Sequence, residues 1–225
     1  MLLRPPGVYR AQDDTKMLIE AMCRSGRVRG ASVLDVGTGC GALAVAAAQA
    51  GASRVTAIDI SLRSVMATRA NAALNGVSIR ALRGDLFTPV RGELFDLVVT
   101  NPPYVPGPRT RPRRHHISRC WDAGPDGRLL LDRICDAVPG SLAPGGVLML
   151  VQSELTGEVA TLDRLSRAGL DASVTSRARI PFGPVLRGRD QFLREHGVLP
   201  PDQLDEEIVV IEAYATDTTA YRQRQ

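Results

Sequence analysis

The sequence has few aromatic residues and little net charge, and both scarcities restrict what the protein can be. Phenylalanine, tryptophan and tyrosine make up 4% of the 225 residues, so the hydrophobic core must consist mainly of aliphatic side chains. Hydrophobic residues account for 44% and charged residues for 23%, which is ordinary for a globular chain that can bury a sizeable core. The formal net charge of +4 favours acidic partners only weakly.

Disulfide, metal and membrane signals are also missing. The four cysteines, Cys23, Cys40, Cys120 and Cys135, form no CxxC pair, and no histidine stands beside one at ligand spacing. We therefore expect reduced thiols in a cytoplasmic protein that binds no metal. The longest apolar run, 42–48, is far shorter than the ~18 residues that a membrane span needs. The N-terminus lacks the apolar segment of a signal peptide, so we expect no membrane partner.

Apolar segments typical of strands alternate with segments of helical pattern. Strands are expected at 32–36, 54–60, 77–82, 94–100, 147–152, about 171–180 and about 206–214, and helices at 13–24, 42–50, 61–75, 126–142 and 155–168. Because the early strands are apolar on both faces, this pattern predicts an α/β fold whose mostly parallel sheet has helices on both faces. The sequence between the last two expected strands shows no helical pattern, so we expect these strands to be joined without a helix. This predicts an antiparallel last strand.

A glycine-rich turn links the first expected strand to an alanine-rich helix. In residues 35–41 (DVGTGCG), the glycines permit a tight turn and close approach of the backbone to a ligand. Gly37, Gly39 and Ala42 also satisfy the GxGxxG/A pattern of dinucleotide sites, and Asp59 stands near the spacing of a ribose-binding acid. This turn alone does not separate a nicotinamide-dependent enzyme from a methyltransferase.

Asp85 follows the third expected strand. A carboxylate there can accept a hydrogen bond from an adenine amino group, while Leu86 or Phe87 covers the ring. Taken alone, Asp85 after Gly84 is as easily a turn residue. Since Asp35 and Asp59 also stand at strand ends, we favour a binding role.

Asn101-Pro102-Pro103-Tyr104 directly follows the fourth expected strand. The prolines stiffen the backbone and remove N–H donors, so carbonyl groups and the Asn101 amide oxygen become rigidly held acceptors. Two such acceptors can hold both hydrogens of a planar –NH2 group, while Tyr104 stacks on its plane. Asn-Pro marks turns in many proteins, but its place after this strand favours a site for methylating such a nitrogen, where catalysis is mainly positioning.

At these motifs the sequence resembles class I methyltransferases of the HemK/PrmC type, and more closely the short branch without the N-terminal helical domain. The matching segments are 8–9, 13–15, 35–41, 58–59, Asp85, 101–104, 121–128, 131–133, 141–146 and 153–154. The resemblance covers roughly residues 7–180. It implies a Rossmann-like, mostly parallel seven-stranded sheet, with an N-terminal extension and helix at 1–30, one catalytic domain at 31–215 and a disordered tail at 216–225.

The resemblance also implies chemistry and partners. The family methylates the side-chain amide nitrogen of the glutamine in the Gly-Gly-Gln motif of translation release factors, with S-adenosylmethionine as donor. Some members of the short branch work with a small zinc-binding activator subunit. Carried over, Asn101, Pro102 and Tyr104 would hold the target nitrogen. The donor would be bound by Asp14, Thr15, Asp35, Gly37, Gly39, Gly41, Asp59, Ile60, Asp85, Leu86 and Asn101.

Three features depart from the short branch. Ala11 stands where that branch usually has proline. The loop from Arg109 to Arg119 is unusually basic, and it is either a patch that contacts the phosphates of RNA or another acidic partner, or simply a solvated loop. The stretch 181–204 is an extension of unknown role.

Three alternatives to a protein glutamine N5-methyltransferase stay open. Asn101 to Tyr104 would serve a nucleic-acid N-methyltransferase equally well, because the exocyclic nitrogens of adenine and guanine are also planar –NH2 groups. An oxidoreductase would explain the glycine turn but not this tetrapeptide. A non-catalytic binding protein is disfavoured by the intact motifs.

Overall fold

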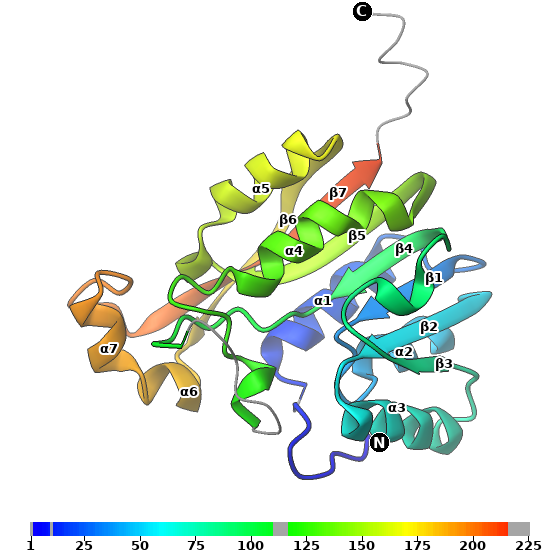
Figure 1. Ribbon diagram of the computed structural model, residues 1–225, viewed down its shortest axis with the longest axis horizontal. Helices are drawn as coiled ribbons and strands as arrows, with labels where there is room; N and C mark the ends of the chain where they lie inside the picture. Colours follow the sequence, from blue (N-terminus) through cyan, green and yellow to red (C-terminus); the bar gives the residue numbers. More distant parts are fainter. Residues whose placement is uncertain (1, 10, 110–116, 216–225) are drawn as a thin grey trace, which may run out of the picture.

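The computed structural model describes residues 2–9, 11–109 and 117–215, which form one seven-stranded sheet with helices around it (Figure 1). The strands are β1 (Ser32–Val36), β2 (Arg54–Asp59), β3 (Arg80–Arg83), β4 (Phe95–Thr100), β5 (Leu142–Ser153), β6 (Leu170–Pro181) and β7 (Asp205–Ala215). Their order across the sheet is β3-β2-β1-β4-β5-β7-β6. Neighbours from β3 to β5 pair in parallel, and β7 pairs antiparallel with both β5 and β6, which confirms the predicted fold class.

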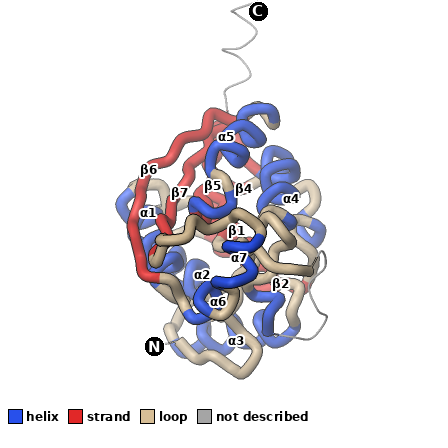
Figure 2. The backbone as a smooth tube through the Cα atoms, turned by 90° about the vertical axis from the view of Figure 1, so that its left-hand side faces the viewer, coloured by secondary structure: helices blue, strands red, loops and turns tan. Residues whose placement is uncertain are grey.

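Two groups of helices cover the sheet. The helices are α1 (Asp13–Arg24), α2 (Ala42–Gln49), α3 (Leu62–Leu74), α4 (Leu129–Ala137), α5 (Glu158–Arg167), α6 (Pro184–Arg187) and α7 (Asp190–Glu195). α1 packs on α2 and α2 on α3, whereas α4 packs on α5. In Figure 2, α1 lies on one side of the central strands β4 and β5, and α4 lies on the other. No helix within the described ranges is long and apolar enough to cross a membrane.

The core is largely aliphatic, as the scarcity of aromatic residues predicts. The central strands β4 and β5 are buried on both faces, because helices cover both sides of the sheet there. Phe95 is the one aromatic residue among the largest fully buried side chains in the described part of the chain. The early helices begin and end where the sequence predicts: the Ser61 hydroxyl caps α3 by accepting a bond from the Ser64 N–H, and Gly76 follows it with φ of +64°.

The expected helix-free connection between β6 and β7 is wrong, although their antiparallel pairing is right. Residues 182–204 contain α6 and α7, which have only four and six residues and so show no clear helical periodicity in the sequence. Element bounds also differ elsewhere. The helix expected at 126–142 is α4 followed by a 3-10 turn at Val138–Ser141, and β5 begins at Leu142 rather than at 147.

This topology brings particular residues to one edge of the sheet. The carboxyl ends of β1 to β5 meet at this edge because these strands run in parallel. β7 runs the opposite way, and Ile208 pairs with Ser153 at the end of β5. The first residues of β7 therefore lie at the same edge as the last residues of the parallel strands.

Candidate active site

The glycine turn after β1 is held tightly against β2. Gly37, Gly39 and Gly41 all have positive φ angles, of +76°, +58° and +85°, which favour glycine at these positions. The N–H of Gly37 donates to the Ile58 carbonyl at 2.8 Å. A Cβ on Gly41 would lie 3.0 Å from the Thr68 side chain, so this glycine also serves close packing of α2 on α3.

Asp35 is fully buried beneath this turn. Its Oδ2 accepts hydrogen bonds from the Thr38 hydroxyl at 2.6 Å and the Ala44 N–H at 3.1 Å, while Oδ1 is buried without a partner. Burial, with a smaller contribution from the nearby Asp59 carboxylate, raises the pKa of Asp35 to about 7 against the lowering effect of these two hydrogen bonds. Asp35 therefore fixes the turn from within and keeps one oxygen unpaired.

Asp59 joins the turn to the start of α3. Its Oδ2 accepts a hydrogen bond from the Gly39 N–H at 3.0 Å, and its Oδ1 accepts one from the Ser61 N–H at 2.8 Å. The next residue, Ile60, is 50% exposed and has an apolar side chain at the edge of the sheet. Sequence spacing placed an acid at this point, and the structure brings it into contact with the glycine turn.

Asp85 and Leu86 lie further along the edge, after β3. The backbone N–H of Gly84 bonds to the Asp59 carbonyl at 3.0 Å, which connects this corner to β2. Asp85 is half-exposed and forms an ion pair with Arg133 of α4 at 2.7 Å, a partner that the sequence did not suggest. Leu86 has φ of +46°, an unfavourable conformation of a kind that clusters at functional sites.

Asp14 is the centre of a cluster of hydrogen bonds at this edge. It lies in the first turn of α1, where a carboxylate is favoured by the helix dipole, and it is only 4% exposed. Its Oδ2 accepts hydrogen bonds from the Tyr9 hydroxyl at 2.9 Å, the Asn101 amide at 3.0 Å and the Tyr104 hydroxyl at 2.9 Å. Oδ1 accepts a bond from the N–H of Thr15 at 2.6 Å. One buried carboxylate thus joins three segments of the chain.

The Asn101 carboxamide has a defined orientation. Its Nδ2 donates to Asp14 Oδ2 and to the Thr15 hydroxyl oxygen at 2.9 Å. An ionised carboxylate only accepts hydrogen bonds, so the reversed orientation would set two acceptor oxygens against each other. The Asn101 carbonyl oxygen therefore points away from Asp14 and is suited to accept a bond from an N–H group.

The Tyr104 ring is 8% exposed, and its hydroxyl is tied down by Asp14. Burial, together with the Asp14 carboxylate, raises the pKa of Tyr104 well above its ordinary value, so the hydroxyl remains protonated. Tyr104 thus provides a fixed neutral ring beside Asn101 and Pro102.

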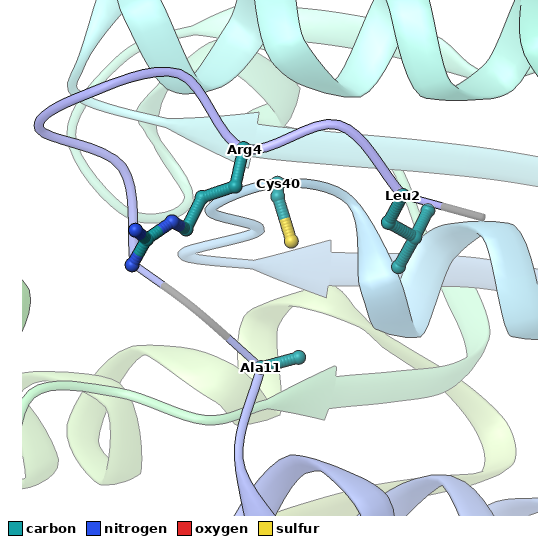
Figure 3. A pocket seen from close by; sticks show the side chains of 4 residues that line it. All are labelled: Leu2, Arg4, Ala11 and Cys40. Atoms are coloured by element: carbon teal, nitrogen blue, oxygen red, sulfur yellow. The ribbon is translucent and has the colours of Figure 1, made fainter.

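Two cavities adjoin the glycine turn. The smaller has a volume of about 20 Å³ and is lined by Tyr9, Ala11, Thr15, Gly37, Thr38, Gly39, Cys40, Ala42, Leu43 and Asn101. It joins the predicted donor residues Thr15, Gly37 and Gly39 to Asn101, but it does not reach Asp59 or Asp85. The larger, about 260 Å³, is lined by Leu2, Arg4, Ala11 and Cys40 (Figure 3).

Glu206 is a residue of this edge that sequence analysis did not identify. It stands at the start of β7 and is 6% exposed, and its Oε2 is buried without a partner. Burial raises the pKa of Glu206 to about 7, against the effect of a hydrogen bond from Ser153, and the Asp14 charge adds to the rise. The only feature of the sequence that could have pointed to Glu206 is its place at the start of an antiparallel last strand, because such a strand begins at the edge where the parallel strands end.

The basic loop predicted at 109–119 falls largely outside the described residues, which omit 110–116. Arg109 is exposed at the beginning of this gap. The expected tail at 216–225 lies outside the described residues as well.

Two buried carboxyl groups at this edge are incompletely satisfied. Asp35, at the glycine turn, and Glu206, near Asp14, each carry a buried oxygen without a partner; burial is the main cause of the raised pKa of both, and nearby carboxylates add to it. S-adenosylmethionine carries a sulfonium and an ammonium group against one carboxylate, so its net charge is positive. Positive charge near Asp35 would favour its ionised form and offset the cost of burying it.

A comparison with protein families assigns the chain. The model of the family described as "Methyltransferase small domain" matches residues 2–116, about half of the chain. The chain belongs to this methyltransferase family. It is therefore a methyltransferase, and the family implies S-adenosylmethionine as its methyl donor.

Two relatives agree with this assignment. The chain is 34% identical over 177 residues to a protein of Methanocaldococcus jannaschii assigned as a protein N5-glutamine methyltransferase, covering 79% of this chain and 88% of the relative. It is 31% identical over 190 residues to the release factor glutamine methyltransferase of Geobacter sulfurreducens, covering 82% of this chain. The match spans 66% of that bacterial protein, so a third of the bacterial protein has no counterpart in the alignment.

A solved structure shows the same fold. One chain of the Mtq2–Trm112 complex of E. cuniculi, which is responsible for methylation of the eRF1 translation termination factor, superposes with a TM-score of 0.66 at 25% identity. The superposition covers 93% of this methyltransferase and 99% of that chain. The HemK/PrmC resemblance drawn from the motifs is confirmed by these matches.

Replacing Glu206 by glutamine is expected to stabilise the free methyltransferase at alkaline pH. The pKa of Glu206 is about 7 in the folded protein against an ordinary 4.5, so the folded state binds this proton more tightly than the unfolded state. The stability that the bound proton contributes to the folded state is fully present below pH 4.5 and is lost as the pH rises through 7. Glutamine has no charge to bury, so the variant should gain roughly 3 kcal/mol over wild type at pH 8 and almost nothing at pH 4.5.

Urea unfolding at the two pH values measures this difference. Glu212→Gln is the matched control, because Glu212 lies on the same face of β7 and its carboxylate accepts a hydrogen bond from the Tyr214 hydroxyl. An equal gain in both variants, or a gain that does not depend on pH, would show that the Glu206 carboxyl is not the source of the effect.

Proposed function

We propose that this methyltransferase transfers a methyl group to the side-chain amide nitrogen of a glutamine in a release-factor-like protein. The observation that supports this most directly is the orientation of the Asn101 carboxamide, whose nitrogen is held by Asp14 and Thr15. Its oxygen is left to accept a hydrogen from a planar –NH2 group. The fixed Tyr104 ring beside it fits the flat face of such a group.

The residues would act mainly by positioning. S-adenosylmethionine supplies, when bound, a methyl group activated by the positive sulfur. The Asn101 oxygen and the Pro102 carbonyl hold the two amide hydrogens, which aims the nitrogen at that methyl carbon and disperses the charge that develops on the nitrogen. Transfer would form the carbon–nitrogen bond as the donor's carbon–sulfur bond breaks, and the nitrogen held at Asn101 and Pro102 would then lose one proton to solvent.

We propose the following residues as donor site. The turn with Gly37, Gly39 and Gly41, buttressed by Asp35, holds the methionine part together with Thr15 and the Asn101 backbone. Asp59 binds the ribose. Asp85 accepts a hydrogen bond from the adenine amino group, with Ile60 and Leu86 against the ring. Because Asp85 pairs with Arg133, adenine would share or displace that ion pair.

The names of the relatives favour protein as the acceptor. The M. jannaschii and G. sulfurreducens proteins are both glutamine methyltransferases by name, and the Mtq2–Trm112 complex acts on a termination factor. These matches do not favour the nucleic-acid alternative. Since its proposed substrate takes part in translation, we also place this methyltransferase in the cytoplasm.

The acceptor is tested by offering labelled S-adenosylmethionine together with release factors, tRNA, rRNA and DNA from the same organism. We expect label on a release factor, and its loss when the Gly-Gly-Gln glutamine is replaced. Label confined to nucleic acid would refute the proposal and would point to the 109–119 loop as a substrate contact.

Asn101→Ala tests how the acceptor is held. The variant should lose at least a hundredfold in the rate of transfer, because one of the two acceptors for the –NH2 group is gone. Binding of S-adenosylmethionine, measured by calorimetry, should change less than about threefold, because alanine keeps the backbone groups. Transfer at a wild-type rate would remove Asn101 from the acceptor site.

We further propose that a small activator subunit binds beside the edge strand β3. The neighbouring helix α3 exposes a row of apolar side chains, of which Leu62 is 53%, Met66 54% and Leu74 62% exposed. A row of this kind next to an unpaired strand edge is typical of a protein interface. The Mtq2 complex shows that one structural relative works with a partner chain.

Met66→Glu should weaken binding of a Trm112-like subunit from the same organism by at least tenfold, because it puts a charge into the apolar row. Val159→Glu is the control, since Val159 is 64% exposed on α5, away from β3. Co-purification and titration calorimetry measure both variants. Equal binding by the two would exclude this face as the interface.

A further inference from the structure

The segment 182–204 packs onto the loop that follows Asn101 to Tyr104. Its side chains form a small core of their own, made by Phe182, Leu186, Leu193 and Leu199, each at most 5% exposed. Val105 of the catalytic loop and Leu155 pack against this core. The extension is therefore attached to the acceptor side of the site and is more than a surface insertion.

Arg189 makes the polar part of this attachment. Its Nη1 donates to the Pro106 carbonyl at 2.8 Å and to the Val105 carbonyl at 3.4 Å, and its Nη2 pairs with the Asp122 carboxylate. The Arg189 side chain is 17% exposed and that of Asp122 is 7% exposed, so the pair is largely shielded from solvent. A Cβ on Gly107 would lie 2.6 Å from Nη1, so a larger residue there would displace the Arg189 guanidinium from its present position.

The groups that Arg189 holds belong to a short ladder of backbone bonds. The Val105 N–H donates to the Trp121 carbonyl at 2.9 Å, and the Gly107 N–H donates to the Gly124 carbonyl at 2.9 Å. Val105 also forms a parallel bridge with Asp122. Arg189 thus contacts both sides of a ladder that begins one residue after Tyr104.

We propose that Arg189 is a positioning residue for methyl transfer, and that segment 182–204 is the wall of the acceptor site. Arg189 touches neither donor nor acceptor. It fixes the backbone that carries Pro102 and Tyr104, and its effect on the acceptor rests on the function proposed above. Because transfer depends on sub-ångström alignment of nitrogen and methyl carbon, a loosened loop should slow the reaction without weakening donor binding.

The chain contains a closely matched control. Arg194 lies on the same extension and also pairs with an aspartate, Asp190, at 2.7 Å. It donates to the Gln203 carbonyl at 2.9 Å and to those of Pro200 and Pro201. All of these partners lie within the extension, whereas all the polar partners given above for Arg189 lie in 105–122.

The experiment compares Arg189→Met with Arg194→Met, on whichever acceptor the wild type labels. Arg189→Met should lower kcat/KM for the acceptor by about ten- to a hundredfold and leave the Kd for S-adenosylmethionine within about twofold. Arg194→Met should lower the Tm by about as much as Arg189→Met does. It should nevertheless keep kcat/KM within about threefold of wild type.

Two further variants guard against misfolding as the explanation. Arg189→Lys keeps the charge but not the forked donors, so it should fold and lie between wild type and Arg189→Met in kcat/KM. The double variant Asp122→Asn with Arg189→Met should have a kcat/KM only slightly below that of Arg189→Met alone, because the two residues act as one pair.

Equal losses of kcat/KM in Arg189→Met and Arg194→Met would overturn the proposal, and so would a matching loss of donor affinity in Arg189→Met. A wild type that labels only nucleic acid would refute the proposed function instead. The Arg189 comparison would then be made on that nucleic acid and judged by the same criteria.

Discussion

The Asp14 carboxylate is the group on which the arrangement of Asn101 and Tyr104 depends. Its Oδ2 receives hydrogen bonds from Tyr9, Asn101 and Tyr104, which lie up to 90 residues away in sequence. Hydrogen bonds to a charged group are about twice as strong as neutral ones, and burial strengthens them further. The same contacts that stabilise the Asp14 charge also set the direction of the Asn101 amide and the plane of the Tyr104 ring.

Much of this edge could be predicted because its residues stand where one element changes to another. Asp35, Asp59 and Asp85 each follow or end an apolar strand, and parallel strands end together, so their proximity follows from the pattern alone. Asn101 and Tyr104 were recognisable because the prolines between them are unusual immediately after a buried strand. In each case a local signal coincided with a topological rule.

The residues that were missed depend on contacts between distant segments. Arg189 lies in a stretch without clear periodicity, and its partners are up to 84 residues earlier in the chain. Arg133 reaches Asp85 from α4, across 48 residues. Glu206 reaches the edge only because β7 reverses direction beside β5. No local pattern encodes such pairs, since each depends on the packing of complete elements.

The two sides of the site differ in how their polar groups are satisfied. Around Asn101, Asp14 and Asp122 have their partners within the protein, so Asn101, Tyr104 and the loop at 105–107 keep their arrangement without a ligand. Asp35 and Glu206 instead each keep a buried oxygen unpaired, which costs stability in the free protein. Of these two, Asp35 lies at the glycine turn, whereas Glu206 lies near Asp14, whose charge contributes to its raised pKa. A rigid arrangement at Asn101 for a neutral amide, and an incompletely satisfied carboxyl group at the glycine turn for a cationic donor, are what the proposed methyl transfer would require.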